Sequence, residues 1–222
     1  RRFELNWEVL RSSLRANLDS INAFSVELRQ PVLSEGRGTA GEQVLARSEE
    51  AQLHARRSPQ DRNSLDLAMS AQAFRDDQQR FPGFSLAAEA RLDAIADRIA
   101  SGRNPLEILR RDGLSGEAGK LEIAPSDGGR LTLSGPFTVA PDGLLDGEIT
   151  ITAERIAALG AFFTALVPGE AEMIRNVAGL LSSLETGGGG EGAGRTASIK
   201  LTIVRGRVSL GLIPVGELPP RF

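Results

Sequence analysis

Residues able to perform acid–base, metal or nucleophilic chemistry are few in this chain. His54 is the single histidine and cysteine is absent, which excludes disulfides, thiolate zinc sites and cysteine nucleophiles. His54 alternates with the polar Gln52 and Arg56, and this pattern predicts a solvent-facing histidine on a strand. A metal or Ser-His-Asp site would need carboxylates placed by the fold alone. We therefore expect no catalytic residue, no metal ligand, no cofactor and no enzymatic activity.

Paired carboxylates occur at Glu49-Glu50 and Asp76-Asp77. Neighbouring residues of a strand point to opposite faces, so neither pair can act as an acid with its base. We expect both pairs to solvate a sheet edge, with a β-bulge at Glu49-Glu50, where the alternation slips. Asp-Gly pairs at 127–128, 142–143 and 146–147 lack the spacing of a calcium loop and predict turns.

Two further segments could be taken for ligand sites, a glycine-rich segment and a cluster of arginines. The glycine-rich residues 187–195 lack the Gly-Lys-Ser/Thr ending of a phosphate loop and precede a predicted strand, so we interpret them as a flexible loop. Arg56, Arg57 and Arg62 fall in one predicted hairpin turn. They could contact anionic lipid headgroups or a phosphate, or they could simply be solvated.

The length allows one large β-rich domain or two small ones. Because no boundary stronger than a loop divides the chain, we expect one β-rich domain over residues 1–222. The formal charge of -3 is small and both signs are interspersed, which argues against a nucleic-acid partner. No apolar run reaches the roughly 18 to 20 residues that a bilayer-spanning helix needs. Because the chain opens at Arg1 without an initiator methionine, we expect an upstream signal or membrane anchor.

Apolar residues recur at every second position in most of the chain, which is typical of half-buried strands. Turn signals such as 141–143 separate these segments, and Asn104-Pro105 has the pattern of a helix N-cap. The fold class predicted is α+β, a long curved antiparallel β-sheet of meanders and hairpins with a few helices packed on one face. The clearest strand signals are Phe24–Leu28, Leu65–Ala73, Phe84–Leu92, Leu131–Val139 and Ile199–Ile203.

Two helical patterns interrupt the second half, at 156–166 and 173–184, and Pro168-Gly169 separates them. They offer more apolar surface than a thin sheet requires. Either this helical hairpin only packs on the sheet, or it forms a lid over an apolar groove that admits acyl chains. The candidate ligand-binding residues are Phe162, Phe163, Leu166, Met173, Ile174, Val177 and Leu181.

The strand and turn patterns of the last hundred residues also carry a family resemblance. Ile203–Pro219, following Leu131–Gly135 and Gly143–Gly147, resembles an uncharacterised alphaproteobacterial envelope family, a DUF2125-like domain of unknown function that is distantly similar to AsmA-like proteins. The resemblance implies a periplasmic body behind an inner-membrane anchor, with a curved sheet whose concave face holds apolar ligand. It supplies no catalytic residues.

Three functions follow from these patterns. The first is a non-enzymatic envelope domain that binds or shields lipid or another apolar ligand, or scaffolds envelope proteins. The second is a protein-interaction module that uses exposed strand edges and no small ligand. The third is a hydrolase with carboxylate chemistry. The ligand, the partner and the oligomeric state stay open.

Overall fold

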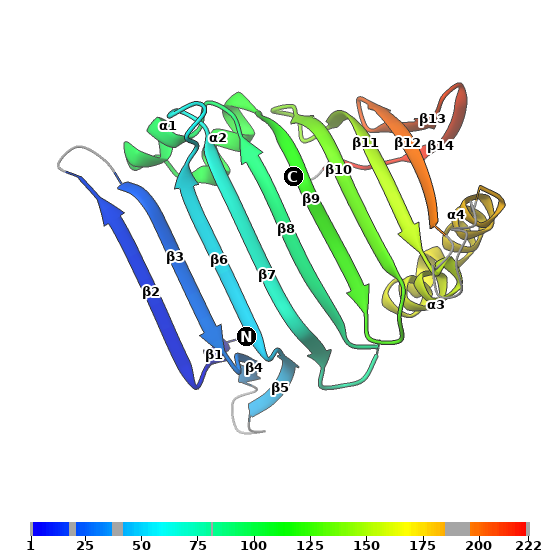
Figure 1. The fold of residues 1–222 in the computed structure, drawn as a ribbon, viewed down its shortest axis with the longest axis horizontal. Helices are drawn as coiled ribbons and strands as arrows, with labels where there is room; N and C mark the ends of the chain where they lie inside the picture. The colour runs from blue at the N-terminus through cyan, green and yellow to red at the C-terminus, as the bar shows by residue number, and fades with distance from the viewer. Residues whose placement is uncertain (1, 18–20, 37–41, 81, 185–195, 221–222) are drawn as a thin grey trace.

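The computed structural model describes residues 2–17, 21–36, 42–80, 82–184 and 196–220, most of which form one open antiparallel sheet (Figure 1). Its strands are β1 (Arg2–Asn6), β2 (Val9–Ala16), β3 (Ile21–Arg29), β4 (Val32–Gly36), β5 (Glu42–Arg47), β6 (Glu50–Arg57), β7 (Leu65–Asp76), β8 (Phe84–Leu92), β9 (Leu114–Pro125), β10 (Arg130–Val139), β11 (Leu145–Glu154), β12 (Thr196–Val204), β13 (Arg207–Leu210) and β14 (Ile213–Glu217). The helices are α1 (Ala96–Ala100), α2 (Pro105–Asp112), α3 (Ile156–Leu166) and α4 (Ala171–Ser183), with a 3-10 turn at Pro168–Glu170.

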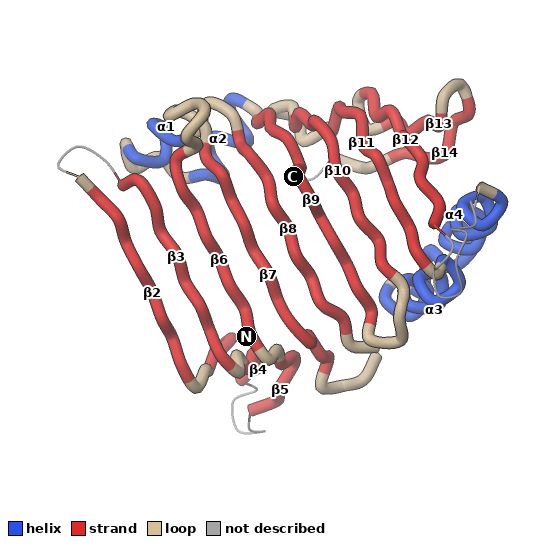
Figure 2. Tube along the Cα trace, in the orientation of Figure 1, coloured by secondary structure: helices blue, strands red, loops and turns tan. Residues whose placement is uncertain are grey.

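The long strands lie in the order β2-β3-β6-β7-β8-β9-β10-β11-β12, followed by β13 and β14. Each is antiparallel to its neighbours, and Figure 2 shows how much of the molecule they occupy. The predicted large antiparallel sheet is confirmed. That residues 1–222 form one domain stays a prediction, and the glycine-rich loop predicted at 187–195 lies outside the described residues.

A small sheet, β1-β4-β5, joins the main one at the end of β7, where Ala46 pairs with Asp76. The chain turns a corner between β5 and β6, because the Glu49 amide donates to the Gln72 carbonyl at 2.9 Å. Buried Ser48 also donates its hydroxyl to that carbonyl at 2.6 Å. The predicted bulge at Glu49-Glu50 is therefore wrong: the alternation slips there because the chain leaves one sheet and enters the other.

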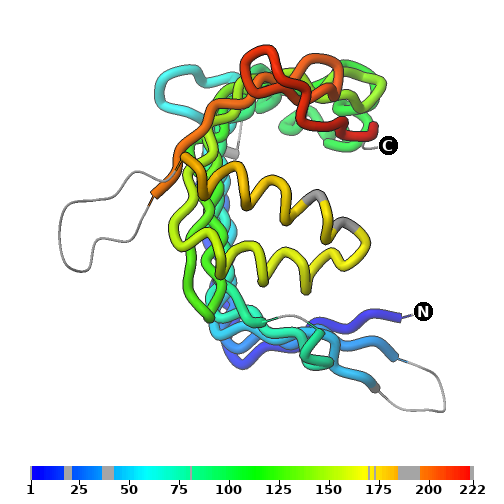
Figure 3. Tube along the Cα trace, turned by 90° about the vertical axis from the view of Figure 1, so that its right-hand side faces the viewer, coloured from blue at the N-terminus to red at the C-terminus, as the bar shows by residue number. Residues whose placement is uncertain are grey.

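The main sheet is curved along its strands, so that its two long margins bend to the same side (Figure 3). We call this concave side the trough. The helices α3 and α4 stand in the trough and run away from the sheet towards its open side. Their base packs on β11 and β12 in the main apolar core, made of Ala153, Ile156, Leu159, Leu181, Ala197 and Ile199. That α1 and α2 pack on this same face stays a prediction.

Cap and turn patterns in the sequence predicted some of the connections between elements correctly. The Asn104 side chain accepts a hydrogen bond from the Leu106 amide at 2.9 Å, and Pro105 begins α2, which confirms the predicted cap. Asp142-Gly143 forms the turn between β10 and β11, with Gly143 at φ 81°. Asp146-Gly147 was predicted as a turn, and this is wrong because both residues belong to β11.

Candidate functional site

The floor of the trough is a row of apolar residues that crosses nine strands. Residues paired across neighbouring strands share one face of a sheet, so successive register pairs define this long row. Eight spacings of about 4.8 Å make it about 38 Å long. From β2 to β12 its members are Leu10, Leu28, Ala51, Ala71, Leu86, Ile123, Leu131, Ala153 and Ala197.

A second row runs parallel to the long row, and on each strand its member lies two residues away from the member of the long row. All its members except Ser12 at the end are apolar, and it consists of Ser12, Val26, Leu53, Met69, Ala88, Leu121, Leu133, Ile151 and Ile199. The residues between the two rows face the opposite side, and their row contains Arg11, Glu27, Gln52, Glu122 and Thr152. The sheet thus has an apolar inner face and a polar outer face.

The two apolar rows are covered at one end only. At the base of α3 and α4, Ala153 is 0% exposed and Ala197 is 1% exposed. At the other end Leu10 is 45%, Leu53 43% and Met69 47% exposed. Contiguous exposed apolar surface of this kind marks a ligand or partner site far more often than isolated exposed leucines do. The alternation had predicted a buried face, which holds for β11 and β12 and not for β6 and β7.

The helical hairpin encloses an apolar cavity of about 210 Å³ against the sheet. Four of the residues predicted to bind ligand line it, namely Phe163, Ile174, Val177 and Leu181. The remaining lining residues were not among those predicted to bind ligand: Leu131, Ile151, Ile156, Leu159, Gly160 and Ala178. The cavity exceeds the ~150 Å³ of an engineered apolar cavity that holds benzene, so it has room for a small apolar group.

The other predicted hairpin residues have different places. Phe162 is 2% exposed and lies outside the cavity lining, with its ring centroid 5.5 Å from that of Phe84 in β8. This edge-on contact fixes α3 to the middle of the sheet. Leu166 ends α3 and is 36% exposed. The side chain of Met173 lies outside the described part of the structure.

The predicted arginine cluster is wrong. Arg56 and Arg57 belong to β6 and not to the turn, and as neighbours in a strand they point to opposite faces. Arg56 bonds Asp66 at 3.2 Å, while Arg57 is 13% exposed and donates to Asp97 Oδ1 at 2.7 Å. Arg62 is exposed in the turn. These three side chains therefore do not present one cationic surface.

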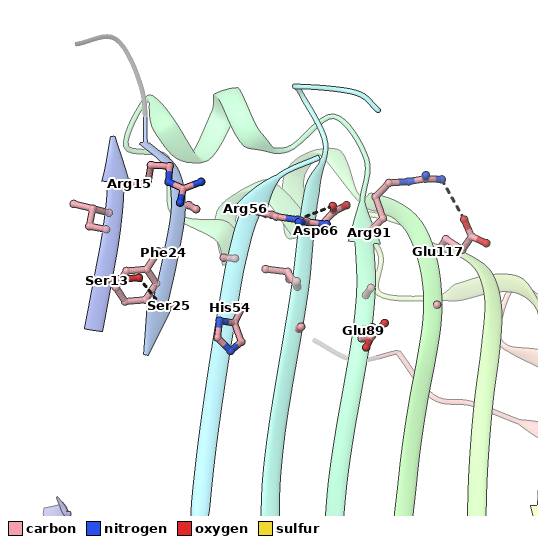
Figure 4. A pocket seen from close by; sticks show the side chains of 17 residues that line it. Ser13, Arg15, Phe24, Ser25, His54, Arg56, Asp66, Glu89, Arg91 and Glu117 are labelled. Carbon is pink, nitrogen blue, oxygen red and sulfur yellow. Dashed lines mark hydrogen bonds and ion pairs between the residues drawn. The ribbon is translucent and has the colours of Figure 1, made fainter. Parts of the chain in front are cut away.

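The outer face carries a wide hollow of about 810 Å³, which charged and apolar residues line together (Figure 4). Its arginines, Arg15, Arg56 and Arg91, are balanced by Asp66, Glu89 and Glu117. Arg56 points to Asp66, and Arg91 bonds Glu117 Oε2 at 3.1 Å. With equal numbers of both charges the hollow has no net attraction for an ion of either sign.

Groups suited to acid–base chemistry are scattered or already paired. His54 is exposed on the outer face, as the alternation predicted. Its Nε2 lies 3.2 Å from Gln52 Oε1. Within the described residues no three His, Asp or Glu side chains gather to hold a metal ion. Asp76 was predicted to solvate an edge, and this is wrong: it is 5% exposed. Hydrogen bonds from the Arg80 side chain lower the pKa of Asp76 from 3.8 to about 2.

Comparison with known proteins identifies the family. Residues 1–219 match the model of a family described as an uncharacterized protein conserved in bacteria, DUF2125. The chain belongs to this family. A search of curated proteins found no match. Among the described residues of this DUF2125 member, no helix is long and apolar enough to cross a membrane.

Proposed function

We propose that this DUF2125 chain is a non-enzymatic domain that binds or shields lipid acyl chains, or a similar apolar ligand, along the trough. The observation that carries the proposal is the pair of apolar rows, which cross nine strands and stay uncovered over β2, β6 and β7. The polar outer face makes the sheet amphipathic, which favours a ligand on the inner face.

The energy available for such binding is substantial. Each methylene buried contributes about 0.8 kcal/mol, so a chain of ten methylenes covered on one side only could still bind with several kcal/mol. The hairpin supports the proposal as an end wall for the ligand, since Phe163, Ile174 and Val177 line its cavity. We extend the proposal to all four helices packing on the trough face, which the cavity shared by α1 and Leu65 supports.

The cellular setting is part of the same proposal. The sequence patterns are similar to those of alphaproteobacterial, AsmA-like envelope proteins, and we propose a periplasmic body held at the inner membrane by an upstream anchor. An apolar trough close to a bilayer would exchange lipid with it over a short distance. Labelling of the outer face with a membrane-impermeant reagent in intact and permeabilised cells tests this location.

The decisive experiment is native mass spectrometry and lipid extraction of the purified protein, with two neighbouring substitutions. Leu53→Glu places a charge on the trough floor, and we expect at least tenfold less bound lipid because a carboxylate is costly beside acyl chains. His54→Glu changes the next residue of β6, which is exposed on the outer face, and should leave lipid binding intact. A wild-type protein free of lipid that also fails to take up lipid from vesicles would refute the proposal.

A protein-interaction module is the second candidate, and the open side of β2 favours it. Within the described residues β2 pairs only with β3, and all eight of its residues are exposed. Such an edge can accept a strand from a partner. Ser12→Pro would remove an edge amide, and loss of partner binding with lipid binding retained would support this candidate over the first.

A further inference from the structure

A second cavity lies where α1 meets the trough, and unlike the hairpin cavity it has arginine in its lining. Its volume is about 480 Å³. The apolar part of its lining comes from Phe24, Ala55 and Leu65 on the sheet and from Ala96 and Ile99 on or beside α1. Arg57 lines the same cavity, together with Arg56, Asn17 and Asn22. Because neighbouring residues of a strand point to opposite faces, the Arg56 side chain turns to Asp66 on the outer face, and the Arg57 guanidinium stands at the rim of the apolar floor.

The position of Arg57 is unusual for a charged residue. In β6 it continues the alternation Ala51, Leu53, Ala55 that faces the trough, and it pairs with Leu65 of β7. Among the described residues of β2, β3, β6 and β8 to β12, the positions that face the trough carry no other ionisable side chain. In β7 the alternation reaches Asp76 only after the irregularity near Ala73, and Asp76 is paired with Arg80.

The Arg57 guanidinium donates to at least two oxygen acceptors. Its Nη1 donates to Asp97 Oδ1 at 2.7 Å and to the Arg62 carbonyl at 2.8 Å. The Arg57 side chain is 13% exposed, whereas that of Asp97 is 67% exposed. Asp97 can turn into solvent at little cost, while the guanidinium cannot leave the rim without losing its packing. An incoming anion could thus replace the Asp97 carboxylate.

We propose that Arg57 receives the anionic headgroup of an amphiphile whose acyl chain lies along the apolar rows. This inference rests on the proposed function and adds the class of ligand to it. A half-buried guanidinium binds phosphate or carboxylate oxygens more strongly than an exposed one, because solvent screens it less. From β6 to β11 the floor extends about 24 Å, and one acyl chain spans about 15 Å, half the hydrocarbon thickness of a bilayer.

Two lysolipids with the same acyl chain test the headgroup preference directly. Lysophosphatidic acid carries a phosphate monoester, and lysophosphatidylcholine carries no net charge. Titration calorimetry below their micelle concentrations should give at least tenfold tighter binding of lysophosphatidic acid to the wild-type protein. Inorganic phosphate alone should bind far more weakly, because it lacks the chain.

Single substitutions assign the preference to Arg57. Arg57→Gln should bring lysophosphatidic acid down to the affinity of lysophosphatidylcholine. Arg91→Gln removes an arginine that bonds Glu117 on the outer face and does not line this cavity, and it should change neither affinity. Asp97→Asn frees Arg57 from its competing carboxylate and should tighten lysophosphatidic acid binding, a gain that misfolding cannot produce.

Each alternative result has a distinct meaning. Equal wild-type affinity for the two lysolipids would overturn the headgroup inference and leave the apolar trough intact. An equal loss in Arg91→Gln and Arg57→Gln would overturn the assignment to the trough face. Inorganic phosphate binding as tightly as lysophosphatidic acid would show a simple anion site and also overturn it. If neither lysolipid binds, the proposed function itself fails.

Discussion

The attachment of the helical hairpin through Phe162 makes the sharpest stability prediction. Phe162 is 2% exposed. Its ring centroid lies 5.5 Å from that of Phe84 and 5.2 Å from that of Phe163, and both contacts are edge-on. Truncating a buried phenylalanine costs about 3–5 kcal/mol, and each lost ring pair adds about 0.5–1.5 kcal/mol within that range. The neighbouring apolar cavity gives the site little to collapse onto, so we expect about 4 kcal/mol for Phe162→Ala.

Urea unfolding followed by far-ultraviolet circular dichroism measures this change. Leu166→Ala is the matched control, since Leu166 also belongs to α3 but is 36% exposed, and it should cost about 1 kcal/mol or less. Hydrogen exchange adds a local measurement: amides of α3 and α4 should lose protection in Phe162→Ala before those of β6 to β9. A loss below about 1 kcal/mol, or exchange that rises uniformly, would refute the view that Phe162 anchors the hairpin.

Three further substitutions, two in the sheet and one in α4, have predictable effects on stability. Asp76→Asn should destabilise the protein by ~1.5–3 kcal/mol at neutral pH because Arg80 loses charged hydrogen bonds. In the folded protein the pKa of Asp76 is lowered from 3.8 to about 2. The wild type should therefore keep this contribution to stability above about pH 4 and lose it as the pH falls towards 2. Urea unfolding at several pH values checks both points, and an unchanged difference at pH 2 and pH 7 would contradict them. Gly135→Ala should cost more than about 1 kcal/mol, because Gly135 has φ 137° and a Cβ would overlap the Glu148 carbonyl oxygen. Gly179→Ala in α4 meets no atom within 4 Å and should instead stabilise by ~0.5–1 kcal/mol, so thermal melts that move both variants the same way would argue against the backbone explanation.

Local patterns predicted much of the fold because they act within a few residues. The helices at 156–166 and 171–183, the cap at Asn104 and most long strands follow from spacing and turn chemistry. Strand β2 was missed, since Leu10 and Leu14 are separated by serines and arginine instead of a clean alternation. The opposite directions of Arg56 and Arg57 could have been predicted, because both lie at the end of an alternating strand.

The trough itself could not be predicted from local patterns. Alternation says which residues share a face of one strand, but only the register joins nine strands into continuous rows. Whether a face is covered depends on where distant helices pack, as the contrast between Ala197 and Met69 shows. The ion pair of Arg57 with Asp97 joins residues forty positions apart, so its presence at the rim of the trough is likewise a product of the tertiary structure.

The dimensions of the hairpin explain why part of the floor stays open. α3 has 11 residues and α4 has 13, which makes them about 16 Å and 20 Å long. Laid along the floor, neither could cover a row of about 38 Å, and both instead run away from the sheet towards the open side of the trough (Figure 3). They bury β11 and β12 at their base and leave Leu53 and Met69 half exposed. A sheet with this arrangement leaves apolar side chains exposed beside the hairpin, which is the feature that the proposed function requires.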